Sequence, residues 1–189
     1  HKIRFITILV GFLSFFVINV QGQINATKIV IIEGKDNSIP ERSVVASFIK
    51  RVLERSDVTV ERIDESEVLK KNILKNFNAA ILLGQPSRNS LVQQAFVTSG
   101  VRPPQGDYPG PEGFVIKTIK EGIGGTLGTL PVIIASGVDE RGTIYALTRL
   151  MRESKYLANT VEIPNLKIID KPAFEYRGSE MGHMDRNQA

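Results

Sequence analysis

Short apolar runs separated by segments of helical periodicity constrain the fold of this sequence more than any other feature. The runs at 28–33 (KIVIIE), 79–83 (AAILL) and 130–135 (LPVIIA) are rich in β-branched or aliphatic residues. Runs of this length and composition are typical of strands, and 79–83 is apolar enough to be a fully buried one. Strands that alternate with helices indicate a sheet covered by helices.

Helices are expected after Ser38, over 66–77, over 88–98 and after Asp139. Ser and Asp are favoured N-cap residues, since their side-chain oxygens accept hydrogen bonds from the first free backbone N–H groups. The first helix should place an apolar stripe on the sheet, consisting of Val45, Phe48, Ile49 and Val52. The inner face of the last helix is expected to contain Ile144, Leu147, Thr148 and Met151.

Further strands are predicted over 58–63, 114–119 and 166–169, and the proline- and glycine-rich segment 100–113 is expected to be an irregular loop. The glycines of 122–128 are interpreted as a hairpin turn, because a strand follows them rather than the helix of a phosphate-binding loop. The predicted fold is α/β (an α+β sandwich), a mixed β-sheet with helices packed on it.

One glycine, Gly142, falls inside the last predicted helix. Glycine there costs about 1 kcal/mol relative to alanine. We therefore expect a close contact between this helix and the sheet, which only a residue without a side chain would permit.

The N-terminal segment 1–22 has the layout of a signal peptide. Lys2 and Arg4 precede an apolar stretch from Phe5 to Val20, which is shorter than the roughly 20 apolar residues of a spanning helix. The expectation is an exported protein, periplasmic, outer-surface or extracellular, with no stable membrane insertion after cleavage. An uncleaved membrane anchor is the alternative. The chain has no Cys, so disulfides would not stabilise it.

Composition and charge exclude several function classes. The chain of 189 residues carries a formal net charge of +4 and shows no clustered basic excess, so no nucleic-acid partner is expected. No cofactor and no metal are expected either. Glu180, His183 and Asp185 lie close together in the sequence, but Glu180 and His183 would point to opposite faces of a strand.

Three ordered motifs carry a resemblance to a known group of enzymes. They are PEGFVI at 111–116, GVDERGTIYA at 137–146 and IDKPAFEYRG at 169–178. This series resembles the N-terminal accessory domain of exported glycoside hydrolases, chiefly bacterial β-N-acetylhexosaminidases, with α-glucuronidases having a similar domain. The resemblance implies an accessory domain over 23–170. It also implies that 171–189 begins a catalytic (β/α)₈ TIM barrel with its first strand.

In that comparison Arg177 matches an arginine that binds sugar hydroxyls at the barrel entry. A guanidinium suits this role because its fixed fork can donate to two neighbouring hydroxyls; an ion pair inside the barrel is the other interpretation. Glu180 is the second candidate substrate-binding residue, without a role as acid catalyst. The sequence departs from the hexosaminidases at Gly182, where they usually have Asp, which keeps an α-glucuronidase-like parent open.

The sequence therefore predicts a non-catalytic domain of a secreted glycosidase, β-N-acetylhexosaminidase-like, whose catalytic residues would lie in the barrel. Its expected partners are that catalytic domain, docked within the same chain, and through it a carbohydrate substrate. Two alternatives remain: a carbohydrate-binding module, and a free-standing cell-envelope α/β protein without catalysis. Aromatic residues make up only 7% of the chain, which argues against a surface that stacks sugars.

Overall fold

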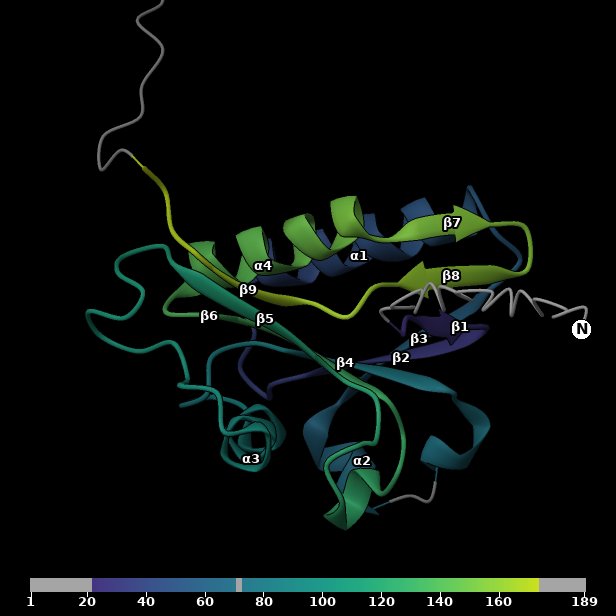
Figure 1. Cartoon of the computed structure of the whole chain (residues 1–189), viewed down its shortest axis with the longest axis horizontal. Coiled ribbons are helices and arrows are strands. Elements are labelled where there is room, and N and C mark those ends of the chain that lie inside the picture. The colour runs from purple at the N-terminus through teal and green to yellow at the C-terminus, as the bar shows by residue number, and fades with distance from the viewer. Residues whose placement is uncertain (1–21, 71–72, 174–189) are drawn as a thin grey trace, which may run out of the picture.

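The computed structural model describes residues 22–70 and 73–173, and its centre is a six-stranded mixed sheet (Figure 1). The strands are β2 (Lys28–Glu33), β3 (Thr59–Asp64), β4 (Ala79–Leu83), β5 (Phe114–Ile119), β6 (Val132–Gly137) and β9 (Lys167–Asp170). They lie in the order β3-β2-β4-β6-β5-β9. The first four are parallel, whereas β5 is antiparallel to both of its neighbours. The predicted mixed α/β sheet is confirmed.

Helices cover both faces of this sheet, as Figure 1 shows. They are α1 (Ile39–Leu53), α2 (Glu65–Lys70), α3 (Ser90–Ser99) and α4 (Glu140–Glu153), with 3₁₀ turns η1 (Ile73–Asn76) and η2 (Gly125–Leu127). α1 and α4 lie side by side on one face, and α2 and α3 lie on the other. Within the described residues, no helix is both long and apolar enough to cross a membrane.

The core consists of two apolar clusters, one on each face of the sheet, because successive side chains of a strand point to opposite faces. In β4, Ile81 packs with the α1 and α4 side chains and Leu82 with those of α3. All five residues of β4 are buried. A strand that is buried on both faces has a continuous apolar sequence, which is why the strand at 79–83 was predictable.

A second, three-stranded sheet was not predicted from the sequence. It contains β1 (Ile24–Ala26), β8 (Thr160–Ile163) and β7 (Lys155–Leu157), in that order. Strands of three or four residues are too short to show a period of two. The sheet extends the α1 side of the core with four buried side chains, those of Ile24, Ala26, Val161 and Ile163.

Two predictions about helices need correction. The segment 66–77 does not form one helix, because α2 ends at Lys70 and a separate 3₁₀ turn begins at Ile73. In α4, Ile144 and Thr148 are only half-buried, although both were expected on the inner face. The buried residues of α4 are Gly142, Thr143, Ala146, Leu147, Leu150 and Met151.

Gly142 explains why the buried face of α4 differs from the predicted one. A Cβ added to Gly142 would overlap the carbonyl oxygen of Gly113, in the turn before β5, and would lie 3.1 Å from the Cα of Gly137. The close contact predicted for Gly142 is therefore confirmed. Because the helix approaches the sheet through this small residue, the side of α4 that carries Gly142 and Ala146 faces inward.

We expect Gly142→Ala to destabilise the protein by roughly 2 kcal/mol, because the new methyl group overpacks the contact with Gly113. At an exposed helical position the same change would stabilise by up to about 1 kcal/mol. Urea unfolding would measure the difference in free energy of unfolding. Ser47→Ala, on the exposed side of α1, is the control. A stabilised Gly142→Ala variant would contradict the tight contact.

Candidate functional site

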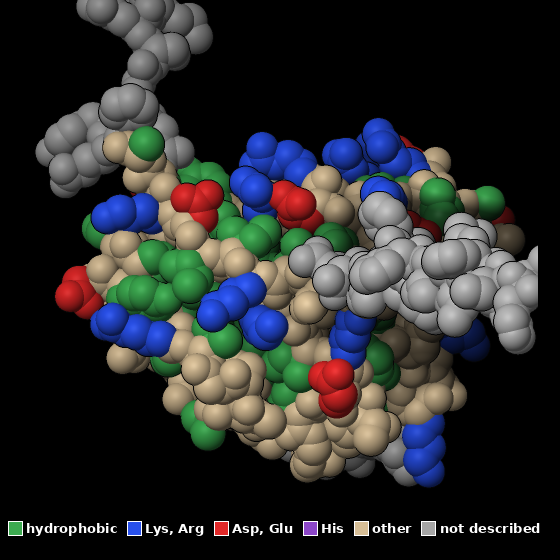
Figure 2. Space-filling view, in the orientation of Figure 1, with side chains coloured by type: hydrophobic (Ala, Val, Ile, Leu, Met, Phe, Trp, Pro, Cys, Tyr) green, Lys and Arg blue, Asp and Glu red, His purple; other side chains and the backbone are tan. Residues whose placement is uncertain are grey.

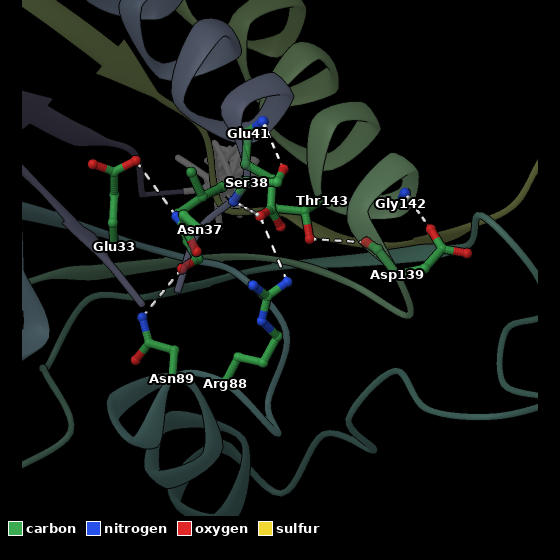
Figure 3. A network of polar contacts seen from close by, with 10 residues as sticks. Glu33, Asn37, Ser38, Glu41, Arg88, Asn89, Asp139, Gly142 and Thr143 are labelled. Carbon is green, nitrogen blue, oxygen red and sulfur yellow. Dashed lines mark hydrogen bonds and ion pairs between the residues drawn. The ribbon is translucent and has the colours of Figure 1, made fainter. Parts of the chain in front are cut away.

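The carboxyl ends of β2, β4 and β6 form the edge of the sheet where α/β proteins usually bind ligands. From β2 the chain continues into α1 on one face, and from the adjacent β4 it continues into α3 on the other. The N-termini of α1 and α3 therefore lie at this edge, on opposite faces of the sheet. Figure 3 shows polar side chains from the end of β2 and from the segments that follow β2, β4 and β6 gathered at this edge.

Asn89, the N-cap residue of α3, connects that helix to two strands. Its Oδ1 accepts hydrogen bonds from the backbone N–H of Leu91 and Val92, at 3.0 and 3.1 Å. Its Nδ2 donates to the carbonyl oxygens of Leu83 and Ile32, at 3.1 and 3.5 Å. The residue is 1% exposed, so all four contacts are shielded from water. One side chain thus joins β2, β4 and the start of α3.

The start of α1 is held by a capping box. Ser38 Oγ accepts from the backbone N–H of Glu41, and Glu41 Oε2 accepts from the backbone N–H of Ser38 at 2.8 Å. The Glu41 carboxylate is buried and lies 3.8 Å from Arg88 Nη1 of the β4–α3 loop. Its other oxygen, Oε1, has no hydrogen-bond partner among the described residues. Glu41 therefore joins the starts of α1 and α3 electrostatically.

Glu33 ends β2 and has its carboxylate nearly buried at the same edge. Arg62 Nε lies 3.1 Å from Glu33 Oε2, and Asn37 Nδ2 donates to Glu33 Oε1 at 3.4 Å. Burial raises the pKa of the Glu33 carboxyl above its ordinary value, although Arg62 and Asn37 act to lower it. Burial therefore outweighs the ion pair in setting the protonation of Glu33.

A pocket of about 320 Å³ opens beside Glu33. Its charged lining residues are Glu33, Asp64, Glu67, Lys35, Arg42 and Arg62. Three acidic and three basic side chains balance, so the pocket offers no excess charge to an ionic ligand. The polar groups at this edge largely satisfy one another, which makes them a structural junction between the strands and the helices.

A second polar cluster lies at the start of α4. The Asp139 carboxylate accepts from the backbone N–H of Gly142 at 2.8 Å and from that of Glu112 at 2.9 Å. Glu112 has a positive φ of 56°, which is uncommon for a residue other than glycine. Its carboxylate accepts hydrogen bonds from Arg141 Nη1 at 2.6 Å and from the Tyr145 hydroxyl at 3.4 Å. These contacts fix the 111–113 turn against α4.

The predicted substrate-binding residues, Arg177 and Glu180, lie outside the described residues. His183 and Asp185, which are close to Glu180 in the sequence, also lie outside them. Across 22–70 and 73–173, no group of three or more His, Asp or Glu side chains could hold a metal ion. Sequence reasoning missed Glu33 and Asn89. A signal for Glu33 was present, since it is a polar residue at the end of a buried strand.

Comparison with known proteins gives similarity at the level of fold. No family model matches the sequence, and no curated protein matches it. Among solved structures, it is similar to BtGH115A, a family GH115 4-O-methyl-α-glucuronidase with specificity for decorated arabinogalactans. The TM-score is 0.52 at 14% identity, over 82% of this chain and 19% of that chain. CpGH84D gives a TM-score of 0.42 at 13% identity, over 74% of this chain and 20% of that one.

These structural neighbours are glycoside hydrolases, and this chain spans about a fifth of the length of each. At this level of identity the BtGH115A comparison establishes a shared fold and no shared site. BtGH115A thus contains at least one further large region that this chain does not match.

We expect Asn89→Ala to lower the free energy of unfolding by roughly 2–3 kcal/mol, because it removes a cap and leaves two buried carbonyl oxygens without their donor. Thermal and urea unfolding would measure the loss. Ser99→Ala, which removes one hydroxyl contact with the Phe96 carbonyl at the other end of α3, is the matched control. Equal losses in the two variants would contradict the joining role of Asn89.

The raised pKa of Glu33 predicts a pH dependence of stability with a definite sign. Between the ordinary glutamate pKa and the raised one, the folded protein binds more protons at Glu33 than the unfolded chain does. The contribution of Glu33 to stability therefore falls as pH rises through that window, upward from about 4.5. Glu33→Gln cannot lose a proton, so its stability relative to wild type should increase with pH. A flat or falling difference in urea midpoints from pH 4 to 7 would contradict the raised pKa.

Proposed function

We propose that this chain is the α/β accessory domain of an exported glycoside hydrolase, which supports a catalytic barrel physically and supplies no catalytic residue. The observation that carries the proposal is the shared fold with BtGH115A, which covers most of this chain but only 19% of that enzyme. A fold that accounts for so small a part of a glycosidase suits a supporting domain. The three sequence motifs point to the same class of enzyme independently of the fold.

The chemistry of the sheet edge supports a non-catalytic role. Hydrolysis of a glycosidic bond usually needs two carboxyl groups about 5–10 Å apart on either side of the sugar. The carboxylates of Glu33, Glu41 and Glu112 are each engaged by an arginine. Carboxylates that are tied to neighbours in this way are structural partners, and a substrate would have to displace those neighbours.

For the parent enzyme, two substrate classes follow from two different observations. The motif series favours a β-N-acetylhexosaminidase-like parent, as the sequence analysis expects. The fold likeness to BtGH115A favours the α-glucuronidase-like alternative. We retain both, because the residues that would distinguish them belong to the catalytic barrel.

We place the docking surface for the barrel at β9. Among the described residues this strand pairs with β5 and with no strand on its other side, and it carries the chain toward residue 173. Figure 2 shows apolar side chains gathered over β5 and β9 among Lys and Arg side chains, and Ile169 of β9 is 42% exposed. The 111–113 turn, held by Asp139 and Arg141, borders the same corner. An open strand edge with an apolar face suits burial under a following domain.

The proposal is tested by reading the gene beyond codon 189 and assaying the complete protein. We expect several hundred further codons and hydrolysis of either a 4-nitrophenyl N-acetyl-β-glucosaminide or a 4-O-methylglucuronosyl oligosaccharide. Glu33→Gln in the complete protein should leave kcat within about twofold, since a structural carboxylate does not act in the transition state. A stop codon soon after 189, or a loss of kcat of about a thousandfold in Glu33→Gln, would overturn the proposal.

A further inference from the structure

A second hollow, of about 370 Å³, lies between α3 and the carboxyl ends of β4 and β6. Its lining comes from the loops after β4, α3 and β6 and from α3 itself: Gln85, Pro86, Ser87, Gln93, Pro104, Gln105, Gly106 and Val138. None of these residues is charged. The hollow therefore differs in kind from the pocket beside Glu33, whose lining is mostly charged.

The backbone around this hollow is fixed, whereas its polar side chains are free. The Gln85 carbonyl accepts from the N–H of Arg88 and Asn89, at 3.0 and 3.1 Å. Gln105 and Tyr108 exchange two backbone hydrogen bonds, at 2.8 and 3.0 Å. Yet four polar side chains of the lining make no hydrogen bond to any described residue. They belong to Gln85, Ser87, Gln93 and Gln105. Donors and acceptors on a fixed frame are available to a ligand.

A buried hydroxyl at the end of β6 is also without a partner. Ser136 is fully buried, and its Oγ has no hydrogen bond among the described residues. Ile134 belongs to the cluster on the α3 face and Ala135 to the opposite one, so alternation places Ser136 on the α3 face. Val138, two residues further along, lines the hollow. Buried hydroxyls are normally hydrogen-bonded, so this one leaves an unsatisfied polar group two residues before Val138 on the α3 face of the sheet.

We propose that this hollow binds one unit of an uncharged sugar. Each glutamine side chain offers donors and an acceptor, and each sugar hydroxyl both donates and accepts, so the two are complementary. Pro86, which is half-buried, provides apolar surface for the C–H face of a sugar ring. An ionic ligand would lose hydration here without meeting an opposite charge, which disfavours it. The proposal deepens the proposed function, because it rests on a carbohydrate-degrading context and gives the accessory domain a sugar contact of its own.

The test is a titration of the full chain followed by ¹⁵N–¹H NMR. The probes are methyl β-D-galactopyranoside, methyl β-D-glucopyranoside and N-acetylglucosamine, each to about 50 mM, since a few hydrogen bonds give affinities near the millimolar range. Sodium glucuronate is the charged comparison. We expect at least one neutral sugar to shift the backbone amide signals of residues 85, 87–93, 105 and 106, with a weaker response to glucuronate.

Variants of two neighbouring glutamines on α3 provide the matched control. Gln93 lines the hollow, whereas the Gln94 amide lies against the turn at Gly125. Gln93→Ala should weaken sugar binding roughly three- to tenfold by removing one or two hydrogen bonds, and Gln94→Ala should leave it unchanged. Gln93 is exposed, so its truncation leaves the core intact.

Four results would overturn the sugar site: no response to any neutral sugar, shifts confined to other residues, equal weakening in both variants, or tighter binding of glucuronate than of every neutral sugar. None of them bears on the hydrolase proposal, because hydrolysis by the complete protein is measured at the barrel. Conversely, a protein without glycosidase activity could still pass the titration, so the two proposals fail separately.

Discussion

The whole structure depends on burial of the parallel strands β2, β4 and β6 on both faces. The chain leaves all three strands at the same edge of the sheet. There each loop must turn back to begin a helix on one face or the other. Backbone groups at that edge are shielded from water and need partners. Ser38, Asn89 and Asp139 supply them as the N-caps of α1, α3 and α4. Asn89 in addition binds the carbonyl groups of two strands, so the edge is held together by side chains.

This requirement explains why the usual ligand crevice is not an open site here. At this edge the buried carboxylates of Glu33 and Glu41 are paired with Arg62 of β3 and with Arg88 before α3. A ligand at that position would have to displace such partners, and leaving a buried charge without its partner costs several kcal/mol. Free hydrogen-bonding side chains occur instead on the α3 side, at Gln93 and its neighbours. The ion-paired junction and the proposed sugar site thus differ in charge as well as in position.

The sequence predicted the fold better than the site, for physical reasons. A run such as 79–83 is apolar because both of its faces are buried, so composition alone reveals it. The three strands of the small sheet are too short for any period. The prediction of the buried face of α4 was wrong because the tertiary contact of Gly142 with Gly113 outweighs the apolar pattern around Ile144. Asn89 was missed because its role depends on carbonyl groups of strands that only the fold brings beside it.

One short segment connects the two surfaces to which we assign partners. Val138 lines the hollow, while Asp139, the next residue, holds the turn at Glu112, beside β9. The backbone N–H of Val138 also donates to the Gly113 carbonyl at 2.9 Å, which ties the hollow to that turn directly. A barrel docked at β9 would therefore rest on the same rigid segment that borders the hollow. A sugar unit in the hollow would then lie near the catalytic domain, as a contact with a longer glycan requires.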